Sequence, residues 1–538
     1  MCIMRTALLI SFLHLLSGVS FSQSNPFSIE LEPVTNPDLP GIQAYAWGQH
    51  DGLWLIIGGR IDGLHRRQPF ASFSAEERNT RITVIDPLGG NVWSVALTSL
   101  PVPLQDQLSS TNMEFHQSGK SLYLIGGYGY STTIDSKLTY AMLTAVDVPG
   151  MIKAVQHGES LAPYVRFITD TRLAVTGGYL EKIEDIWYLL GGQKFDGNYN
   201  PMNHPTFVQE YTNAIRKFKI KDDGTKMEIV DYSVWSDTSL FHRRDYNAGP
   251  QITAEGQEGI LSFAGPFRVD ADIPYLNVVS LTADQYQEVP GFAQYYHQYH
   301  CAHLPLYDAI RKEMHTVFLG GISQYYPEQD MLVSDSDVPF VKTMARITRG
   351  ADGQYKEYLL PDKMPGFLGA SAEFIPNPAL PRYANGVIKL NDLSEGRSLA
   401  GYVYGGIEST GQNIFWTTEG EASKAHNVLY KVFVVKGSNL VAHTLNPQSQ
   451  NGLQLQVLPK NADETFSIRF NQWDNAAFSL RITTEKGKVL LEMDLTAQPH
   501  IGENVLELAV PTYKIGNRYK VTLTAGDRTA EQVVIVKP

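Results

Sequence analysis

The sequence predicts an all-β protein in which about six similar sheets are followed by a small Ig-like β-sandwich. Three observations support this fold class. Six short apolar runs each end in small residues, the last hundred residues alternate regularly between apolar and polar, and long helical periodicity is nearly absent. The six runs lie at 53–59, 122–127, 186–192, 260–265, 316–321 and 402–406. Recurrence every several tens of residues indicates a repeat architecture.

Each run is too short for a helix and has the composition of a strand buried on both faces. In the first run the apolar residues 53–57 lead directly into Gly58-Gly59. Glycine permits a positive φ and lets another backbone approach closely, which strands need where they converge on the axis of a radial array. The pattern therefore favours a β-propeller. A two-sheet sandwich or several smaller β domains is the alternative.

These repeats resemble those of kelch β-propellers, whose four-stranded blades carry Gly-Gly after the second strand, then a further strand, a Trp and often Leu-Pro. The first unit has Gly58-Gly59, then 83–86, Trp93 and Leu100-Pro101, whereas the fourth departs with Ala264-Gly265. The resemblance covers residues 23–436 and implies about six blades, with a seventh possible. Candidate third strands in the other units lie at 144–147, 214–220, 276–281, 344–347 and 427–435.

The first strand-like segment of the mature chain is predicted to complete the last sheet. Residues 27–31 alternate between apolar and polar as a strand with one buried face does. Pairing with the last sheet would close the ring and remove its free edges.

The N-terminal 22 residues have the pattern of a secretory signal peptide. Arg5 precedes an apolar stretch at 7–19, which is too short to span a membrane, and cleavage is expected before Gln23. We therefore expect an extracellular or outer-surface protein with no transmembrane segment. Cleavage would also remove Cys2 and leave Cys301 without a partner for an intramolecular disulfide.

The C-terminal region changes character after a polar stretch at 437–452, which we interpret as a linker. Alternating segments across 453–538 predict a small β-sandwich. The hairpin at 485–488, the stretch 516–521 and the terminal strand 533–537 resemble the C-terminal sorting domain of proteins exported by the type IX secretion system of Bacteroidetes. That resemblance implies the secretion machinery as a partner. A fibronectin-like spacer with no export role is the alternative.

The charge balance argues against a nucleic-acid partner. The formal net charge is −12, and the chain contains no basic stripe that could displace counterions from phosphates.

The densest polar cluster in the sequence precedes the fifth apolar run. If this segment is extended, His297, Tyr299, Cys301 and His303 share one face, with His300 on the other. His and Cys bind transition metals, so His297, Cys301 and His303 are weak metal candidates. The preferred interpretation is a hydrogen-bonded channel lining or a ligand-contact patch, and no other cofactor is expected.

A second polar cluster precedes the fourth apolar run. It consists of His242, Arg243, Arg244, Asp245 and Tyr246. Two adjacent arginines with an aspartate could hold an anionic group. Alternatively the Arg–Asp pair braces neighbouring blades, which we prefer. His116, before the second glycine doublet, could join the same channel mouth or lie exposed on the surface.

Two classes of function remain open. The first, which we prefer, is a secreted binding protein whose loops recognise a glycan, a peptide or a protein. The second is an enzyme acting on carbohydrate in the central channel: a hydrolase, lyase or mutarotase, or least favourably a copper oxidase. The sequence contains no phosphate-cradling glycine loop, nucleophile elbow or zinc-protease motif, and it assigns no catalytic residue.

Overall fold

The computed structural model confirms that the protein is all-β. It describes residues 25–66, 68, 71–200, 206–329, 331–415, 420–437, 444–445, 452–472, 474–495, 499 and 501–537. Strands dominate these residues, and the α-helices among them are α1 (Val102–Leu108), α2 (Val148–His157) and α3 (Thr238–Phe241). No helix in this part of the chain is both long and apolar enough to span a membrane.

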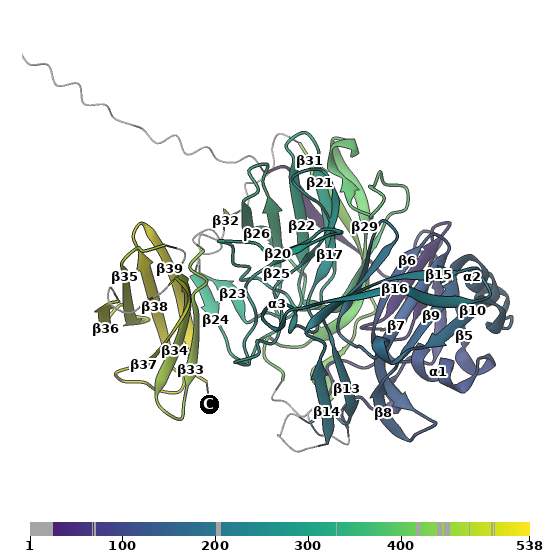
Figure 1. Ribbon diagram of the computed structural model, residues 1–538, viewed down its shortest axis with the longest axis horizontal. Coiled ribbons are helices and arrows are strands. Elements are labelled where there is room, and N and C mark those ends of the chain that lie inside the picture. The colour runs from purple at the N-terminus through teal and green to yellow at the C-terminus, as the bar shows by residue number, and fades with distance from the viewer. Residues whose placement is uncertain are drawn as a thin grey trace, which may run out of the picture.

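Six sheets of mainly antiparallel strands follow one another along the chain (Figure 1). Sheet 1 has the order β2 (Ala46–His50), β3 (Leu53–Ile57), β4 (Arg81–Ile85), β5 (Val92–Ala96). Sheet 2 is β6 (Thr111–Ser118), β7 (Ser121–Ser131), β9 (Met142–Asp147), β10 (Val165–Thr169), with β8 (Ser136–Thr139) on β7. Sheet 3 is β11 (Tyr179–Ile183), β12 (Ile186–Leu190), β15 (Ala214–Asp222), β16 (Met227–Ser236). A separate hairpin consists of β13 (Gln193–Gly197) and β14 (Phe207–Tyr211).

The remaining three sheets have the same arrangement with additions at their edges. Sheet 4 is β17 (Ala248–Ile252), β18 (Glu258–Ser262), β19 (Val279–Leu281), β20 (Tyr286–Glu288). Sheet 5 is β28 (Ile388–Lys389), β21 (His303–Asp308), β22 (Glu313–Leu319), β25 (Thr343–Arg349), β26 (Tyr355–Lys363), β32 (Thr444–Leu445). Sheet 6 is β27 (Phe367–Pro376), β29 (Gly396–Ser409), β31 (Leu429–Lys436), β1 (Ser28–Val34), with β30 (Ser423–Ala425) on β29.

The strand predictions for this region are confirmed. The six apolar runs form β3, β7, β12, β18, β22 and β29. The expected third strands overlap β4, β9, β15, β19, β25 and β31. The predicted N-terminal strand is β1, which pairs antiparallel with β31 from Ser28↔Val435 to Val34↔Leu429.

Glycine doublets connect five of the six sheets to the next. The amide of the second glycine donates to a carbonyl in the following sheet, or just before that sheet, at 2.8–2.9 Å: Gly59 to Ser110, Gly127 to Val175, Gly192 to Arg243, Gly321 to Leu368 and Gly406 to Ile42. Sheet 4 lacks the doublet, and there the amide of Ala264 donates to the side-chain oxygen of Gln294 at 2.9 Å. The bond from Gly406 leads from sheet 6 back to the segment before sheet 1.

Close approach explains why these positions are glycine. Gly320 has a φ of +70°, and a Cβ placed on it would lie 2.1 Å from the carbonyl oxygen of Leu368. Gly405 has the same φ, and its Cβ would lie 2.4 Å from the oxygen of Ile42. A side chain would therefore clash with backbone as well as strain it.

Apolar side chains fill the space between successive sheets. One buried cluster joins sheets 1 and 2 and contains Leu55 and Leu124. Another joins sheets 6 and 1 through Tyr404 and Trp54, whose rings lie 6.5 Å apart. The first strands also contact one another in chain order, from β2 with β6 through to β21 with β27. The core is thus divided among the sheet interfaces.

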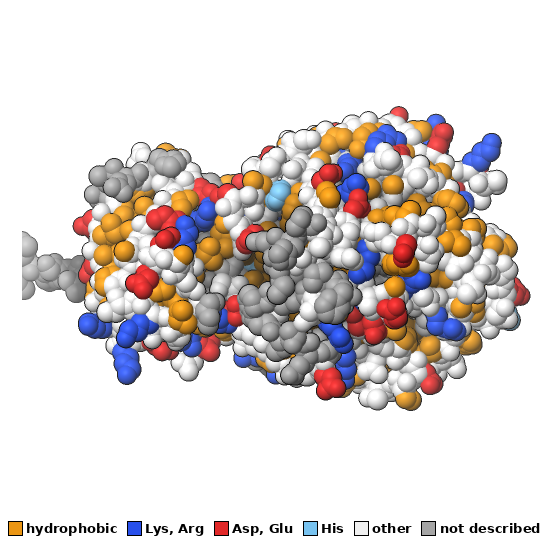
Figure 2. All heavy atoms as spheres, turned by 90° about the horizontal axis from the view of Figure 1, so that it is seen from below, with side chains coloured by type: hydrophobic (Ala, Val, Ile, Leu, Met, Phe, Trp, Pro, Cys, Tyr) orange, Lys and Arg blue, Asp and Glu red, His pale blue; other side chains and the backbone are white. Residues whose placement is uncertain are grey.

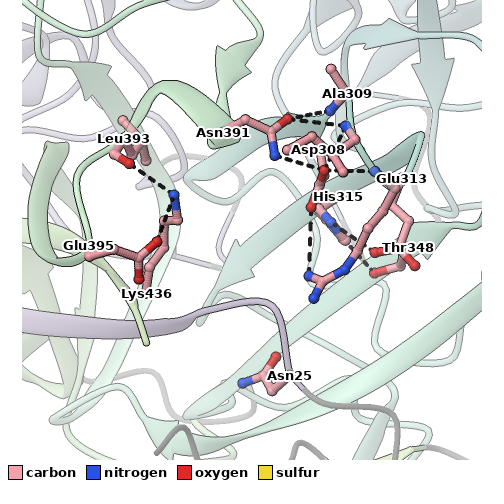
Figure 3. Close-up of polar contacts among 12 residues, drawn as sticks. Asn25, Asp308, Ala309, Glu313, His315, Thr348, Asn391, Leu393, Glu395 and Lys436 are labelled. Atoms are coloured by element: carbon pink, nitrogen blue, oxygen red, sulfur yellow. Dashed lines mark hydrogen bonds and ion pairs between the residues drawn. The ribbon is translucent and has the colours of Figure 1, made fainter. Parts of the chain in front are cut away.

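A polar network fixes the outer end of β21, whose first residue is His303. Asn391, in a 3₁₀ turn, accepts from the amide of Ala309 at 2.6 Å and donates to Asp308 at 2.9 Å (Figure 3). Behind this hairpin, Nδ1 of the fully buried His315 lies 2.9 Å from the hydroxyl of Thr348. These contacts tie the end of β21 to the 390–392 turn and β22 to β25.

The C-terminal region folds into two facing sheets that share one apolar core. The smaller sheet is β33 (Gln456–Lys460), β34 (Thr465–Gln472), β37 (Gly502–Ala509). The larger is β23 (Tyr325–Glu328), β24 (Met331–Ser334), β39 (Arg528–Ile535), β38 (Arg518–Ala525), β35 (Phe478–Thr484), β36 (Val489–Asp494). Strands β23 and β24 come from an insertion within sheet 5 and continue the C-terminal sheet. We call residues 452–537 the C-terminal module, which lies beside the larger body in Figure 1.

Two predicted segments cannot be compared with the fold. The signal peptide at 1–22 lies outside the described residues, as does most of the linker at 437–452. On the face that Figure 2 shows, Lys and Arg side chains are interspersed with Asp and Glu over both the module and the larger body.

Candidate functional site

Two neighbouring cavities lie at the first strands of the six sheets, and one of the two is lined by all six strands. The carboxylate-lined cavity has a volume of about 510 Å³, and all six first strands line it. Its wall includes Trp47, Glu114, His116, Tyr179, Glu181, Pro250, His303 and Glu373. The aromatic-lined cavity has a volume of about 460 Å³. Asn112 and His300 line both cavities, so the two are neighbours.

The aromatic-lined cavity is built by connecting segments together with residues of several strands, among them β7, β13 and β27. Its rings are those of His65, Phe73, Tyr128, Phe195, Tyr199, Phe267, Tyr299 and Phe415. Its charged side chains are Arg244, Asp245, Asp272 and Asp337. Aromatic side chains and a few acidic or basic ones therefore line the same cavity, an arrangement typical of small-molecule sites.

Three of these rings pack together on one wall. The imidazole of His65 stacks on Phe73 at 4.7 Å and meets Tyr199 edge-on at 4.6 Å. Burial lowers the pKa of His65 to about 4, so the ring is neutral at pH 7. This wall thus presents aromatic surface without a charge.

Arg244 and Asp245 supply the fixed charge of the cavity. Nη1 of Arg244 donates to Asp245 at 2.6 Å, and Nε donates to the hydroxyl of Tyr211 at 2.9 Å. Burial disfavours the charged guanidinium, but Tyr211 and Asp245 outweigh it and raise the pKa of Arg244. The guanidinium also lies 5.1 Å from the ring centroid of Phe267. Arg244 thus holds Asp245 through Nη1, while Tyr211 fixes the guanidinium through Nε.

Glu114 is the most unusual group in the carboxylate-lined cavity. Its side chain is buried, and Oε1 accepts from the amide of Gly178 at 2.8 Å, while Oε2 is buried and has no hydrogen-bond partner among the described residues. Burial raises the pKa of Glu114 to about 8. The carboxyl is therefore mainly protonated at pH 7 and able to donate a hydrogen bond or a proton.

Two histidine–carboxylate pairs accompany Glu114. Nε2 of His300 lies 3.4 Å from Glu373, which outweighs burial and raises the pKa of His300. Nδ1 of His116 lies 3.5 Å from Glu181. The cavity therefore holds a mainly protonated carboxyl and two histidine–carboxylate pairs, residue types that acid–base chemistry uses.

His303 lies in the same cavity but is held by backbone. Its Nδ1 faces the carbonyl of Cys301 at 3.2 Å and its Nε2 faces that of Ala248 at 3.1 Å. Burial outweighs these contacts and lowers the pKa of His303. The ring thus links the first strands of sheets 5 and 4.

The segment before β21 is not extended, which was the condition for its His, Tyr and Cys side chains to share one face. Only His303 belongs to a strand, and Gln298 and His300 have positive φ values of 37° and 28°. The expected shared face therefore does not form, because the chain turns twice within this segment. His297 is fully buried and stacks on Tyr299 at 4.8 Å, and within the part of the chain that the structure describes neither ring nitrogen has a hydrogen-bond partner.

The geometry gives no support to a metal site at His297, Cys301 and His303. Burial lowers the pKa of His297 to about 3 and raises that of the Cys301 thiol to about 12, which disfavours the thiolate that metals bind. Within the described part of the chain, no three His, Cys, Asp or Glu side chains gather as a metal would require.

The second predicted cluster divides between structural and cavity-lining roles. Arg243 is buried and donates to the carbonyls of Leu240 and Phe263 at 2.8 and 2.7 Å. Tyr246 donates to the carbonyl of Leu190 at 3.1 Å. His242 stacks on Tyr211 at 3.8 Å. From this cluster, Arg244 and Asp245 reach the aromatic-lined cavity.

Sequence reasoning missed the residues that give each cavity its character. Glu114, Glu181 and Glu373 stand singly on three different strands, and no spacing in the sequence connects them. Phe73 and Tyr199 lie in connections far apart in the chain. Only the packing of separate sheets brings them together.

Comparisons with known proteins add little to this geometry. No family model matches the chain, and no curated protein matches it. Among solved structures, that of YjhT aligns with a TM-score of 0.41 and 8% identity over 76% of this chain and 99% of that chain. At that score the similarity assigns neither fold nor function.

Proposed function

We propose that the six sheets are the blades of a kelch-type β-propeller and that the protein is a secreted or cell-surface binding protein whose ligand occupies the aromatic-lined cavity. Two features support the propeller. Hydrogen bonds from the glycine doublets run from sheet to sheet and return from Gly406 to Ile42, and the first strands of all six sheets line one cavity. Stacked layers would not give a cyclic order of contacts.

The chemistry of the aromatic-lined cavity favours a glycan as the ligand. A sugar ring has an apolar C–H face and a polar hydroxyl edge. The wall of Phe73, His65 and Tyr199 could pack against the C–H face. Arg244 and Asp245 could form hydrogen bonds with the hydroxyl edge. A peptide or protein ligand would be an outcome that refutes this choice.

The observation that carries the proposal is the fixed Arg244–Asp245 pair among these rings. We would screen the mature chain on an array of neutral and acidic glycans, then repeat the screen with Tyr199→Ala and Arg244→Gln. Both variants should lose binding at least tenfold while remaining folded. Tyr232→Ala, on the outer strand β16, is the matched control and should bind normally. Absence of any bound glycan, or equal binding by all variants, would refute the proposal.

A second candidate function is an enzyme acting on carbohydrate, and the observation that favours it is Glu114. A protonated carboxyl could act as the general acid, and His300 with Glu373 could accept a proton. Glu114→Gln should then abolish turnover of a glycan found on the array while leaving its binding intact. Unchanged turnover, or none by the wild-type protein, would exclude this role.

The cellular location of the protein is proposed from its sequence. The signal-peptide pattern and the resemblance of the C-terminal module to type IX sorting domains support export to the cell surface or medium. Expression with and without residues 453–538, followed by fractionation, tests the sorting role: loss of export without the module supports it, and unchanged export contradicts it.

A further inference from the structure

The C-terminal module is joined to sheet 5 by a shared β-sheet. Strand β24 pairs in parallel with β39 through Val333↔Val533 and Ser334↔Val534. The module thereby covers the open edge of an insertion that belongs to the larger body, in the manner of β-augmentation.

Buried groups and ion pairs extend this contact on either side of the shared sheet. Tyr295, fully buried, donates to the carbonyl of Leu455 at 3.2 Å, and Gln456 donates to the carbonyl of Pro274 at 2.9 Å. The ion pairs across the contact include Arg268–Glu503, Arg469–Asp270 and Arg518–Glu328. Such a contact is directional and specific, unlike that of a tethered spacer.

One of the cross-contacts reaches the aromatic-lined cavity. Nζ of Lys537, which follows β39, lies 2.7 Å from Asp335 and 2.9 Å from Asp337. The side chain of Asp335 is 1% exposed, whereas that of Asp337 lines the cavity. A single cation from the module therefore neutralises two carboxylates, one buried and one in the cavity wall.

The turn that carries these carboxylates is strained. Asp335 accepts from the amide of Asp337 at 3.0 Å, and its carbonyl accepts from Val338 at 3.1 Å. Val338 has a φ of +50°, which a β-branched residue rarely adopts. It too lines the cavity. Such a conformation persists only where the surroundings hold it, and here Lys537 is part of those surroundings.

We propose that the C-terminal module is a component of the cavity and that Lys537 is the positioning residue that fixes the 335–338 turn in its wall. The consequence for binding rests on the proposed function, but the ordering of the turn does not. Without Lys537, the carboxylates of Asp335 and Asp337 would lose the cation that they share and would repel each other. They would do so beside the strained Val338. The turn would then open more often, and a ligand would meet a less ordered wall.

Hydrogen exchange of the intact chain tests this without a ligand. Lys537→Ala should speed exchange of amides in 335–341 about tenfold, while amides of β3 and β12 keep their wild-type rates. Lys537→Arg should restore protection, because it keeps the cation. Lys520→Ala, which breaks an ion pair with Glu531 inside the module, should leave the turn unchanged. If the amides of 335–341 exchange in Lys537→Ala at the same rates as in the wild-type protein, the proposal is overturned.

The same variants separate this inference from the proposed function. For any glycan that the array identifies, Lys537→Ala should weaken binding several-fold and Lys537→Arg should not. If the turn loosens but no glycan binds wild-type protein, the proposed function fails and the positioning role stands. If glycans bind and Lys537→Ala alters neither exchange nor affinity, the positioning role fails and the proposed function stands.

Discussion

Replacing Glu114 with glutamine should change how the stability of the protein depends on pH. The pKa of Glu114 is raised from 4.5 to about 8, because burial penalises the charged form. In the unfolded chain the carboxyl ionises near pH 4.5, whereas in the native state it stays protonated until about pH 8. The native state therefore binds more protons across this window, and its stability falls as pH rises.

The size of this effect follows from the two pKa values. Each unit of difference corresponds to about 1.4 kcal/mol, so the loss between pH 5 and pH 8 is roughly 3 to 5 kcal/mol. An unfolding entropy of about 2.1 cal/mol/K per residue over roughly 500 residues converts this into a Tm change of about 3 to 5 °C. The glutamine amide adds a cost of its own at the unpartnered Oε2 position, but that cost does not depend on pH.

The assay is a thermal scan of wild type and Glu114→Gln at pH 5, 6, 7 and 8. The Tm of the variant minus that of wild type should rise by about 3 to 5 °C across the series. Glu159→Gln, at an exposed position, is the matched control and should give a flat difference. Parallel Tm curves for wild type and Glu114→Gln would refute the assignment of a protonated, buried carboxyl.

Three further predictions concern the fold around the cavities. Arg243→Ala should lower stability by about 3 to 5 kcal/mol, because it leaves three buried or partly buried carbonyls without this donor. An unchanged Tm would contradict this structural role of Arg243. Cys301 should resist a thiol reagent at pH 8 in the native protein and react fully in denaturant, because burial raises its pKa to about 12. Rapid labelling of the native protein would contradict this. Gly320→Ala should lower the free energy of unfolding, measured by denaturation, by about 2 to 4 kcal/mol, because its Cβ would meet the Leu368 carbonyl. Gly256 also has a positive φ but has open space around it, so Gly256→Ala should cost only about 1 kcal/mol. Equal costs would refute the close-approach argument.

The strands could be predicted from the sequence because their signals are local. Apolar runs such as 53–57 have a length and composition that suit only a buried strand, and the doublet Gly58-Gly59 marks the end of such a run. The pairing of β1 with β31 was also predictable, since an isolated alternating strand at 27–31 needs a partner. The conformation of the segment before β21 was not, because buried contacts around His297 override its extended propensity.

The candidate sites were only partly predictable. His116, His300 and His303 line the carboxylate-lined cavity, and Arg244 and Asp245 line the aromatic one. Sequence clusters could suggest these residues because polar side chains gathered near a strand end are visible in one dimension. The role of each depends on what faces it, which the sequence does not state.

The sequence by itself determined the all-β composition, the six strand–glycine units and the change of pattern near residue 452, because each depends on neighbours along the chain. Only the tertiary structure decided which side chains meet. It brings Glu373 to His300 and Lys537 to Asp337 across long stretches of chain, and it removes Glu114 from water. Burial and distance set the charge state of a group, and both arise only when separate sheets pack together.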